Sequence, residues 1–213
     1  MLSPSSHFNS RGHAHFRVRA GFTLIEMLVV ISIFLIMTGV ILANFPAFRD
    51  KAALDLLAQE IATTIRQAQV YGIGTREAGS EFTSYGIYFA LDTSKGLNNK
   101  TFYLYADKDA NKNLSPNNPA MCIPASPPGV DCIIEKFTIT GTAKIEVLQG
   151  CTGNCASPTI LPNLGIFFQR FYPEATLPPG YSYVKIVIQS TRDATRKKEI
   201  QVWATGQIVV ANL

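Results

Sequence analysis

The chain has 213 residues and a formal net charge of +4, with 19 Lys and Arg against 15 Asp and Glu. All three histidines lie within residues 1–21, so the rest of the chain cannot build a Ser-His-Asp triad, a Cys-His pair or a histidine-liganded zinc site. The same segment holds three arginines and no acid, which leaves 16 basic and 15 acidic residues beyond it. This near balance gives no reason to expect a nucleic acid partner, and in the absence of a catalytic motif we expect no enzyme.

Residues 1–21 form a positively charged segment that precedes the first apolar run. Its cationic and titratable side chains are Arg11, Arg17, Arg19, His7, His13 and His15. By the positive-inside rule, we expect this segment to stay in the cytoplasm and the bulk of the chain to lie on the far side of the membrane. A secretory signal peptide differs, because its cleavage site follows the apolar region.

Residues 22–45 form an apolar run whose only ionisable side chain is that of Glu26. As a helix, these 24 residues would measure roughly 36 Å at about 1.5 Å per residue, enough to cross a hydrocarbon core of about 30 Å. A carboxylate one turn inside such a helix costs about 2.5–3.5 kcal/mol on insertion scales, so we expect Glu26 to have a cationic partner and a function. An ordinary signal anchor with a stray acid is the alternative.

The hexapeptide GFTLIE at residues 21–26 resembles the class III leader junction of type IV pilins and type II secretion pseudopilins. The resemblance implies that a prepilin peptidase cuts after Gly21 and methylates the new terminal amine of Phe22. It also implies that Glu26 pairs with the terminal amine of a neighbouring subunit during filament assembly, in a layer of low dielectric constant where a charge pair is strong. Cleavage would leave 192 of the 213 residues.

Pro46 follows the apolar run and lacks a backbone N–H, so we expect a kink or short break where the chain leaves the membrane. Residues 46–76 then show the pattern of an amphipathic helix, with a stop signal at Gly72 and Gly74. Its apolar positions, at three- and four-residue steps, are Leu54, Leu57, Ala58, Ile61, Ile65, Ala68 and Tyr71. The two segments together would make a helix of about 50 residues, whose second part buries an apolar stripe against a domain.

Residues 77–213 consist of short β-rich runs separated by clusters of Asn, Gly, Pro, Asp and Ser. The expected strands cover residues 85–90, 101–106, 133–140, 144–148, 164–168, 183–189, 199–204 and 207–210. The predicted fold is α+β, with the long N-terminal helix packed on an extracytoplasmic head domain of one or two antiparallel sheets. Two Gly-Ile-aromatic-Phe strands and a closing Gly-Gln-Ile-Val-Val make the layout similar to the GspH/FimT group of minor pseudopilins and pilins, which have the pilin fold.

All four cysteines lie in the expected head domain, which is consistent with an oxidising compartment. They are Cys122, Cys132, Cys151 and Cys155. Of the three pairings that four cysteines allow, we favour Cys122 with Cys132 and Cys151 with Cys155, because each pair is close in sequence and flanked by turn formers. The alternative is a four-thiolate metal site, whose usual two-residue spacings are absent.

The segment after the expected strand 101–106 resembles the first half of a calcium loop. Oxygen-bearing side chains alternate there at Asp107, Asp109, Asn111 and Asn113. The pattern is incomplete, because residue 112 is Lys where an EF-hand loop has glycine and residue 118 is Asn where it has the bidentate glutamate. The sequence therefore leaves two interpretations open, a weak Ca²⁺ site and a polar hairpin turn.

Residues 191–198 form a basic turn between two expected strands. Its cations are Arg192, Arg196, Lys197 and Lys198. Some FimT-like minor pilins bind DNA through basic residues near the C-terminus, so the resemblance makes this turn a candidate DNA site that would hold phosphates electrostatically. The alternative is a charged hairpin tip that keeps a β protein soluble.

Taken together, the resemblance implies a structural assembly protein without a required cofactor: a GspH-like minor pseudopilin of a type II secretion system. Its expected partners are other pilins or pseudopilins, the prepilin peptidase and the bacterial inner membrane, with the head domain in the periplasm. The alternative is a FimT-like minor pilin of a type IV pilus, with DNA uptake through the basic turn. The N-terminal segment is common to both systems, so the sequence does not choose between them.

Overall fold

The computed structural model describes residues 21–74, 77–78, 81–82, 84–92, 96–109, 111–115, 119–123, 127 and 129–213. Residues 1–20 of the expected leader, together with Asn118 of the candidate calcium loop, lie outside the described residues. The chain divides into two compact units, residues 1–44 and residues 45–213.

Helix α1 (Leu24–Ile73) is 50 residues long and contains Pro46 without interruption. The short break expected at Pro46 is therefore wrong. Proline removes one N–H donor and costs about 3 kcal/mol inside a helix, but regular helix on both sides, packed against the head domain on one of them, keeps the helix continuous. The helix ends at Ile73 rather than at residue 76, and Gly74 N–H donates to the carbonyl oxygen of Val70 at 2.8 Å.

In the first unit, the described residues are 21–44, most of which belong to α1. The large apolar side chains of this unit, from Phe22 to Leu42, are exposed. Among the described residues, α1 is the one helix long and apolar enough to cross a membrane. Because these side chains have no protein core to cover them, they suit a lipid environment.

The second unit holds two five-stranded antiparallel sheets and one small ribbon. The β3 sheet has the order β5 (Cys132–Thr138), β4 (Thr101–Asp107), β3 (Ser84–Ala90), β8 (Asn163–Phe168) and β9 (Ala175–Thr176). The β10 sheet has the order β12 (Ile208–Asn212), β11 (Lys197–Trp203), β10 (Tyr183–Ser190), β6 (Ala143–Cys151) and β7 (Thr159–Leu161). The ribbon pairs β1 (Glu77–Ala78) with β2 (Glu81–Phe82).

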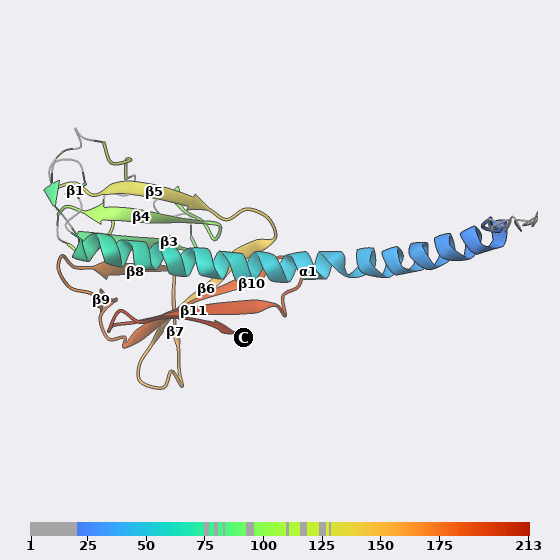
Figure 1. Ribbon diagram of the computed structural model, residues 1–213. Helices are drawn as coiled ribbons and strands as arrows, with labels where there is room; N and C mark the ends of the chain where they lie inside the picture. Colours follow the sequence, from blue (N-terminus) through green and yellow to red (C-terminus); the bar gives the residue numbers. More distant parts are fainter. Residues whose placement is uncertain are drawn as a thin grey trace, which may run out of the picture. The chain divides into compact units, whose positions relative to one another are not determined.

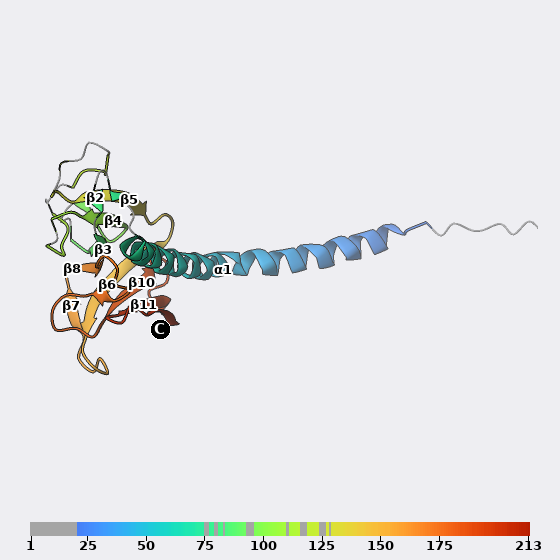
Figure 2. The ribbon, with the colours of Figure 1, turned by 60° about the vertical axis from the view of Figure 1, so that its left-hand side comes forward.

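One apolar core joins residues 54–68 of α1 to both sheets (Figure 1). The helix contributes the stripe that the sequence predicts, except that Tyr71 is only partly buried. The longer strands contribute alternate residues, such as Tyr85, Ile87 and Phe89 of β3, because successive side chains point to opposite faces of a sheet. Figure 2 shows the two sheets at two levels beside this part of the helix. The expected α+β class, with a long helix packed on antiparallel sheets, is confirmed.

The β3 sheet is buried on its outer face as well, where a second cluster contains Tyr88, Tyr103 and Tyr105. Gly86 pairs with Tyr105 in the register of β3 and β4. A Cβ atom at Gly86 would lie 2.6 Å from the Tyr105 ring, so glycine lets this ring lie across the strand. Because both faces are covered, nearly every residue of β3 and every residue of β4 is buried.

Each of the eight expected strands overlaps a strand of the structure. Four further strands, β1, β2, β7 and β9, were not expected. They are two or three residues long, too short to show a hydrophobic period.

Candidate functional site

Glu26 lies in the first turn of α1 and makes a capping box with Thr23. Thr23 donates to Glu26 Oε2 from its N–H at 2.8 Å and from Oγ1 at 2.9 Å, and Thr23 Oγ1 accepts from Glu26 N–H at 3.3 Å. This reciprocal arrangement satisfies donors that a helix start leaves without partners. The sequence analysis overlooked it, although the Thr-x-x-Glu spacing at residues 23–26 is its usual signal.

The expected cleavage junction lies just before the helix. Residues 21–23 have no regular secondary structure, and Phe22 is 84% exposed. Among the described residues, leaving out its chain neighbours, no heavy atom lies within 4 Å of a Cβ built on Gly21. Phe22, on the C-terminal side of the expected junction, is therefore accessible.

Two disulfides lie in the head domain, Cys122–Cys132 and Cys151–Cys155. These are the two pairings that the sequence analysis favours. The first joins the segment before β5 to the first residue of β5, and the second closes a turn at the end of β6. With all four sulfurs paired, the structure offers no thiolate for a four-cysteine metal site.

Three carboxylates meet where β4 ends and β5 begins. Asp107 is the last residue of β4, Asp109 follows it, and Asp131 precedes β5, with one oxygen from each within 4.8 Å of the others. The sequence analysis missed Asp131. The antiparallel register pairs Ala106 with Cys132, which brings Asp131 beside Asp107, and the expected neighbouring strands were the signal that could have found it.

The cluster binds protons unevenly. Burial raises the pKa of Asp107 to about 7, helped by a hydrogen bond with Asp109 and by the negative charge of Asp131. Burial also raises the pKa of Asp131, although backbone N–H groups of Ser115 and Lys108 donate to it at 2.8 Å each. For Asp109, burial is outweighed by hydrogen bonds from Asn111 and Ser115, which lower the pKa. Asp107 is therefore the carboxyl that exchanges a proton near neutral pH.

In the loop that carries Asp109, several backbone N–H groups donate hydrogen bonds to side chains of the same loop. Asn111 N–H donates to Asp109 Oδ1 at 3.1 Å, and Asn113 N–H donates to Asn111 Oδ1 at 2.8 Å. Lys112 has a φ of 62°, the left-handed conformation that glycine favours, and its N–H donates to Asp107 Oδ2 at 3.1 Å. These bonds make the polar turn that was one of the two interpretations. Carboxylate oxygens also suit a hard cation, and calcium binding here stays a prediction.

The basic turn between β10 and β11 makes ion pairs with other parts of the head domain. Each of its four expected phosphate-binding cations has an acidic neighbour. The pairs are Arg192 with Asp50 at 3.9 Å, Arg196 with Asp193 at 2.9 Å, Lys197 with Glu146 at 2.6 Å, and Lys198 with Asp55. Asp50 and Asp55 belong to α1, so the structure places this turn against the helix.

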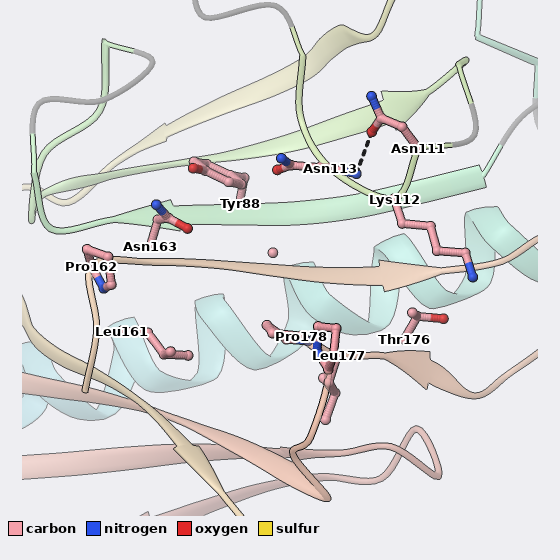
Figure 3. Close-up of a pocket in the computed structure, with 12 residues that line it drawn as sticks. Tyr88, Asn111, Lys112, Asn113, Leu161, Pro162, Asn163, Thr176, Leu177 and Pro178 are labelled. Atoms are coloured by element: carbon pink, nitrogen blue, oxygen red, sulfur yellow. Dashed lines mark hydrogen bonds between the residues drawn. The ribbon is translucent and has the colours of Figure 1, made fainter. Parts of the chain in front are cut away.

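A pocket of about 560 Å³ lies beside β8 (Figure 3). It is lined by Tyr88, Lys112, Asn163 and Pro178, among others, and Figure 3 shows the loop of Asn111 at its rim. Its described lining contains no carboxylate, histidine or cysteine.

Residues 16–42 match the prokaryotic N-terminal methylation motif. Among solved structures, the type IV minor pilin FimU of Pseudomonas aeruginosa is similar to this chain at 13% identity and a TM-score of 0.41, over 76% of this chain and 91% of that chain. At that identity and TM-score, the likeness carries no functional argument. No curated protein matches the chain.

The methylation motif covers the hexapeptide of residues 21–26, in which Gly21, Phe22 and Glu26 are the expected functional residues. Behind it, α1 supplies the apolar segment and then packs on two antiparallel sheets. The chain therefore combines a prokaryotic N-terminal methylation motif with one long helix that packs on two antiparallel sheets.

Proposed function

We propose that this chain is a filament subunit of the type IV pilin class, cut after Gly21, methylated on Phe22 and assembled through Glu26. The observation that carries the proposal is the methylation motif at residues 16–42, with glutamate as the fifth residue after the junction. An exposed junction and an exposed apolar helix behind it are both consistent with this role. The proposed role is structural, with no enzymatic activity of its own.

In this proposal the Glu26 carboxylate receives the terminal amine of a neighbouring subunit. Thr23 fixes the carboxylate at the start of α1 through two hydrogen bonds, so its position is set before a partner arrives. Cleavage would give every subunit one new amine at Phe22 and one carboxylate at Glu26, which are complementary in charge. A charge pair in the membrane layer is much stronger than in water, and this favours ordered addition of subunits.

The proposed location is the bacterial inner membrane, with a single span and the head domain in the periplasm. Three arginines and no acid in residues 1–21 favour a cytoplasmic leader. Two disulfides in the head domain favour an oxidising compartment on the other side. The prepilin peptidase and other pilin-like subunits are the partners that this pathway requires.

More narrowly, we propose a minor pseudopilin of a type II secretion system, added near the filament tip, and retain a minor pilin of a type IV pilus as the second candidate. The loose resemblance of the strand pattern to the GspH/FimT group supports both. Purification of the chain with its filament partners would distinguish them, because the two systems use different subunits. DNA binding by Arg192, Arg196, Lys197 and Lys198 stays a prediction.

The proposal is tested by the intact mass of the N-terminal peptide, isolated from membranes of cells that also produce a prepilin peptidase. The expected product begins at Phe22 and carries one additional methyl group. A chain that keeps residues 1–21 in the presence of active peptidase would contradict the proposal. Gly21→Ala gives the matched control, because a bulkier residue at the junction should block cleavage while leaving membrane insertion intact.

A further inference from the structure

The turn between β10 and β11 is tied to α1 directly after the apolar run of residues 22–45. Arg196 Nη1 donates to the backbone carbonyl oxygen of Ala47. Arg192 Nη1 lies 3.9 Å from Oδ1 of Asp50, whose side chain is buried. Since Ala47 is the second residue after the apolar run, these contacts hold the turn within about one helical turn of the end of the run.

A cleft of about 430 Å³ opens between this turn and residues 47–54 of α1. Its walls combine cations with apolar side chains, among them Lys51, Arg196, Lys197, Lys198, Phe48 and Leu213. Phe48 is 68% exposed and Leu213 is 64% exposed, so the apolar part of the wall is accessible. A molecule that enters the cleft meets positive charge and apolar surface together.

The acids of the head domain balance only part of this positive charge. Arg196, Lys197 and Lys198 have carboxylate partners in Asp193, Glu146 and Asp55. In the part of the chain that the structure describes, neither Lys51 nor Arg49 has a carboxylate within 4.0 Å. Of these two, Lys51 lines the cleft beside Phe48, whereas Arg49 lies over the Phe45 ring.

An anionic phospholipid matches this combination of charge and apolar surface. If residues 22–45 span the membrane, Leu54 follows the span by nine residues, about 14 Å of helix at 1.5 Å per residue. The cleft then lies at the depth of the lipid headgroups, where Lys and Arg side chains attract anionic lipids. DNA fits this place less well, because its phosphates would have to approach the membrane surface, which the anionic lipids make negatively charged.

We propose that this cleft binds the phosphate of an anionic phospholipid, in the leaflet on the head-domain side of the membrane. Lys51 contacts the phosphate, and the exposed ring of Phe48 lies against the glycerol and the upper acyl chain. The inference rests on the membrane insertion proposed above. The bound lipid would hold the head domain at the membrane surface before assembly and would be released when the subunit leaves the bilayer.

The test uses the full chain, purified in a non-ionic detergent and equilibrated with equal amounts of phosphatidylglycerol and phosphatidylcholine that carry the same acyl chains. Native mass spectrometry then measures the ratio of the two lipids retained. We expect phosphatidylglycerol to be retained preferentially. Lys51→Gln should lower the ratio about fivefold, the effect of one cation at an anionic surface. The matched control is Arg66→Gln, an exposed cation further along α1, which should leave the ratio unchanged.

Lys51→Gln keeps every ion pair of the turn, so its effect would not reflect unfolding. Equal retention of the two lipids, or an unchanged ratio in Lys51→Gln, would overturn the proposal. Displacement of phosphatidylglycerol by an excess of inorganic phosphate would show an anion site without lipid preference, which also overturns it.

In a final competition experiment, a short DNA duplex is added to the chain that carries phosphatidylglycerol. If the duplex displaces phosphatidylglycerol and binds more weakly to Lys51→Gln, the cleft is a nucleic acid site and the lipid proposal fails. Alkaline carbonate extraction tests the proposed function separately. If carbonate extracts the chain from membranes, the chain is not inserted and the proposed function fails, whatever lipid the chain retains in detergent.

Discussion

Between Leu24 and Leu42 the large apolar side chains of α1 are exposed, whereas from Leu54 to Ala68 the apolar stripe of the same helix is buried against two sheets. The first region has no protein core of its own. The second is the centre of a core that holds the head domain together. Substitutions should therefore act on different properties in the two regions, assembly in the first and stability in the second.

The difference between the two regions also explains which functional residues the sequence alone can indicate. In the proposed function, side chains of the first region would interact with lipid, with a peptidase and with other subunits, and the residues for these contacts form a contiguous motif in the sequence. Side chains of the head domain satisfy one another across the fold. Asp107 and Asp131, for example, are 24 residues apart in sequence and meet only because β4 and β5 are neighbours.

The largest expected effect is that of Glu26→Val on assembly. Removing the carboxylate removes the proposed partner of the terminal amine, so incorporation into filaments should be abolished. Cleavage after Gly21 and membrane insertion should continue, because neither requires this charge. Sheared filaments and total membranes, probed for the same chain, would measure both quantities.

Thr23→Val is the control that separates charge from helix capping. It removes the hydroxyl of the capping box and keeps the Glu26 carboxylate. Loss of one cap costs about 1 kcal/mol of helix stability, so assembly should fall only partly. If Thr23→Val abolishes assembly as Glu26→Val does, capping rather than pairing between subunits is the role of Glu26.

The second expected effect is on the stability of the head domain, and substitutions of two adjacent leucines of α1 test it. Leu57 is 5% exposed in the core, whereas Leu56 is 72% exposed on the other side of the helix. Leu57→Ala should lower the free energy of unfolding of the head domain by about 2–5 kcal/mol. Leu56→Ala should change it by no more than about 0.5 kcal/mol. Denaturant unfolding of the full chain in detergent, followed by the fluorescence of Trp203, would measure both; equal losses would contradict the described packing.

The helix stripe and the eight main strands were predictable because each is a local pattern, with a period of 3.6 residues in one case and alternation in the other. The arrangement of those strands into two sheets was not predictable from local patterns, because β3 pairs with β8 across more than seventy residues of intervening chain. The tie between Arg196 and Ala47 depends on the same long-range arrangement. Glu26 could be singled out from the sequence because its motif is contiguous, whereas Asp131 was missed because only the pairing of β4 with β5 brings it beside Asp107.

The disulfides give the third prediction. Replacing Cys122 and Cys132 by Ser opens a loop with a sequence separation of 10, and replacing Cys151 and Cys155 opens one of 4. Loop-closure entropy predicts losses of about 3 and about 2 kcal/mol, respectively. Because residues 1–45 contain no cysteine, cleavage and insertion should be unaffected. Unfolding with and without reductant measures the losses, and impaired cleavage in either variant would contradict the independence of the two regions.

The fourth prediction concerns pH and Asp107, whose side chain is buried. Its carboxyl binds a proton more tightly in the folded chain, with a pKa of about 7 against an ordinary 3.8. The folded state is therefore favoured while the proton is bound, and this advantage is lost as the pH rises from about 4 through about 7. We expect a loss of roughly 2 kcal/mol over that range, because neighbouring carboxylates share the shift.

Asp107→Asn should remove most of this pH dependence, because the amide does not titrate. Glu60→Gln, an exposed substitution on α1, should leave it unchanged. Unfolding is measured in the presence of a chelator, so that no divalent cation competes with the proton. A pH profile that is the same in Asp107→Asn as in the natural chain would place the titrating group elsewhere.

Calcium would act at the same oxygens with the opposite dependence on pH. If Asp107, Asp109 and Asp131 hold Ca²⁺, the ion replaces the proton, so its stabilising effect should grow as the pH rises through about 7 and level off above it. At a calcium concentration ten times the dissociation constant, the gain is about 1.4 kcal/mol. Asp131→Asn should weaken this gain, because it removes a ligand that lies outside the loop. Thermal unfolding at pH 8 with calcium or with chelator measures the effect, and equal transitions in the two conditions would leave the polar turn as the full account of this loop.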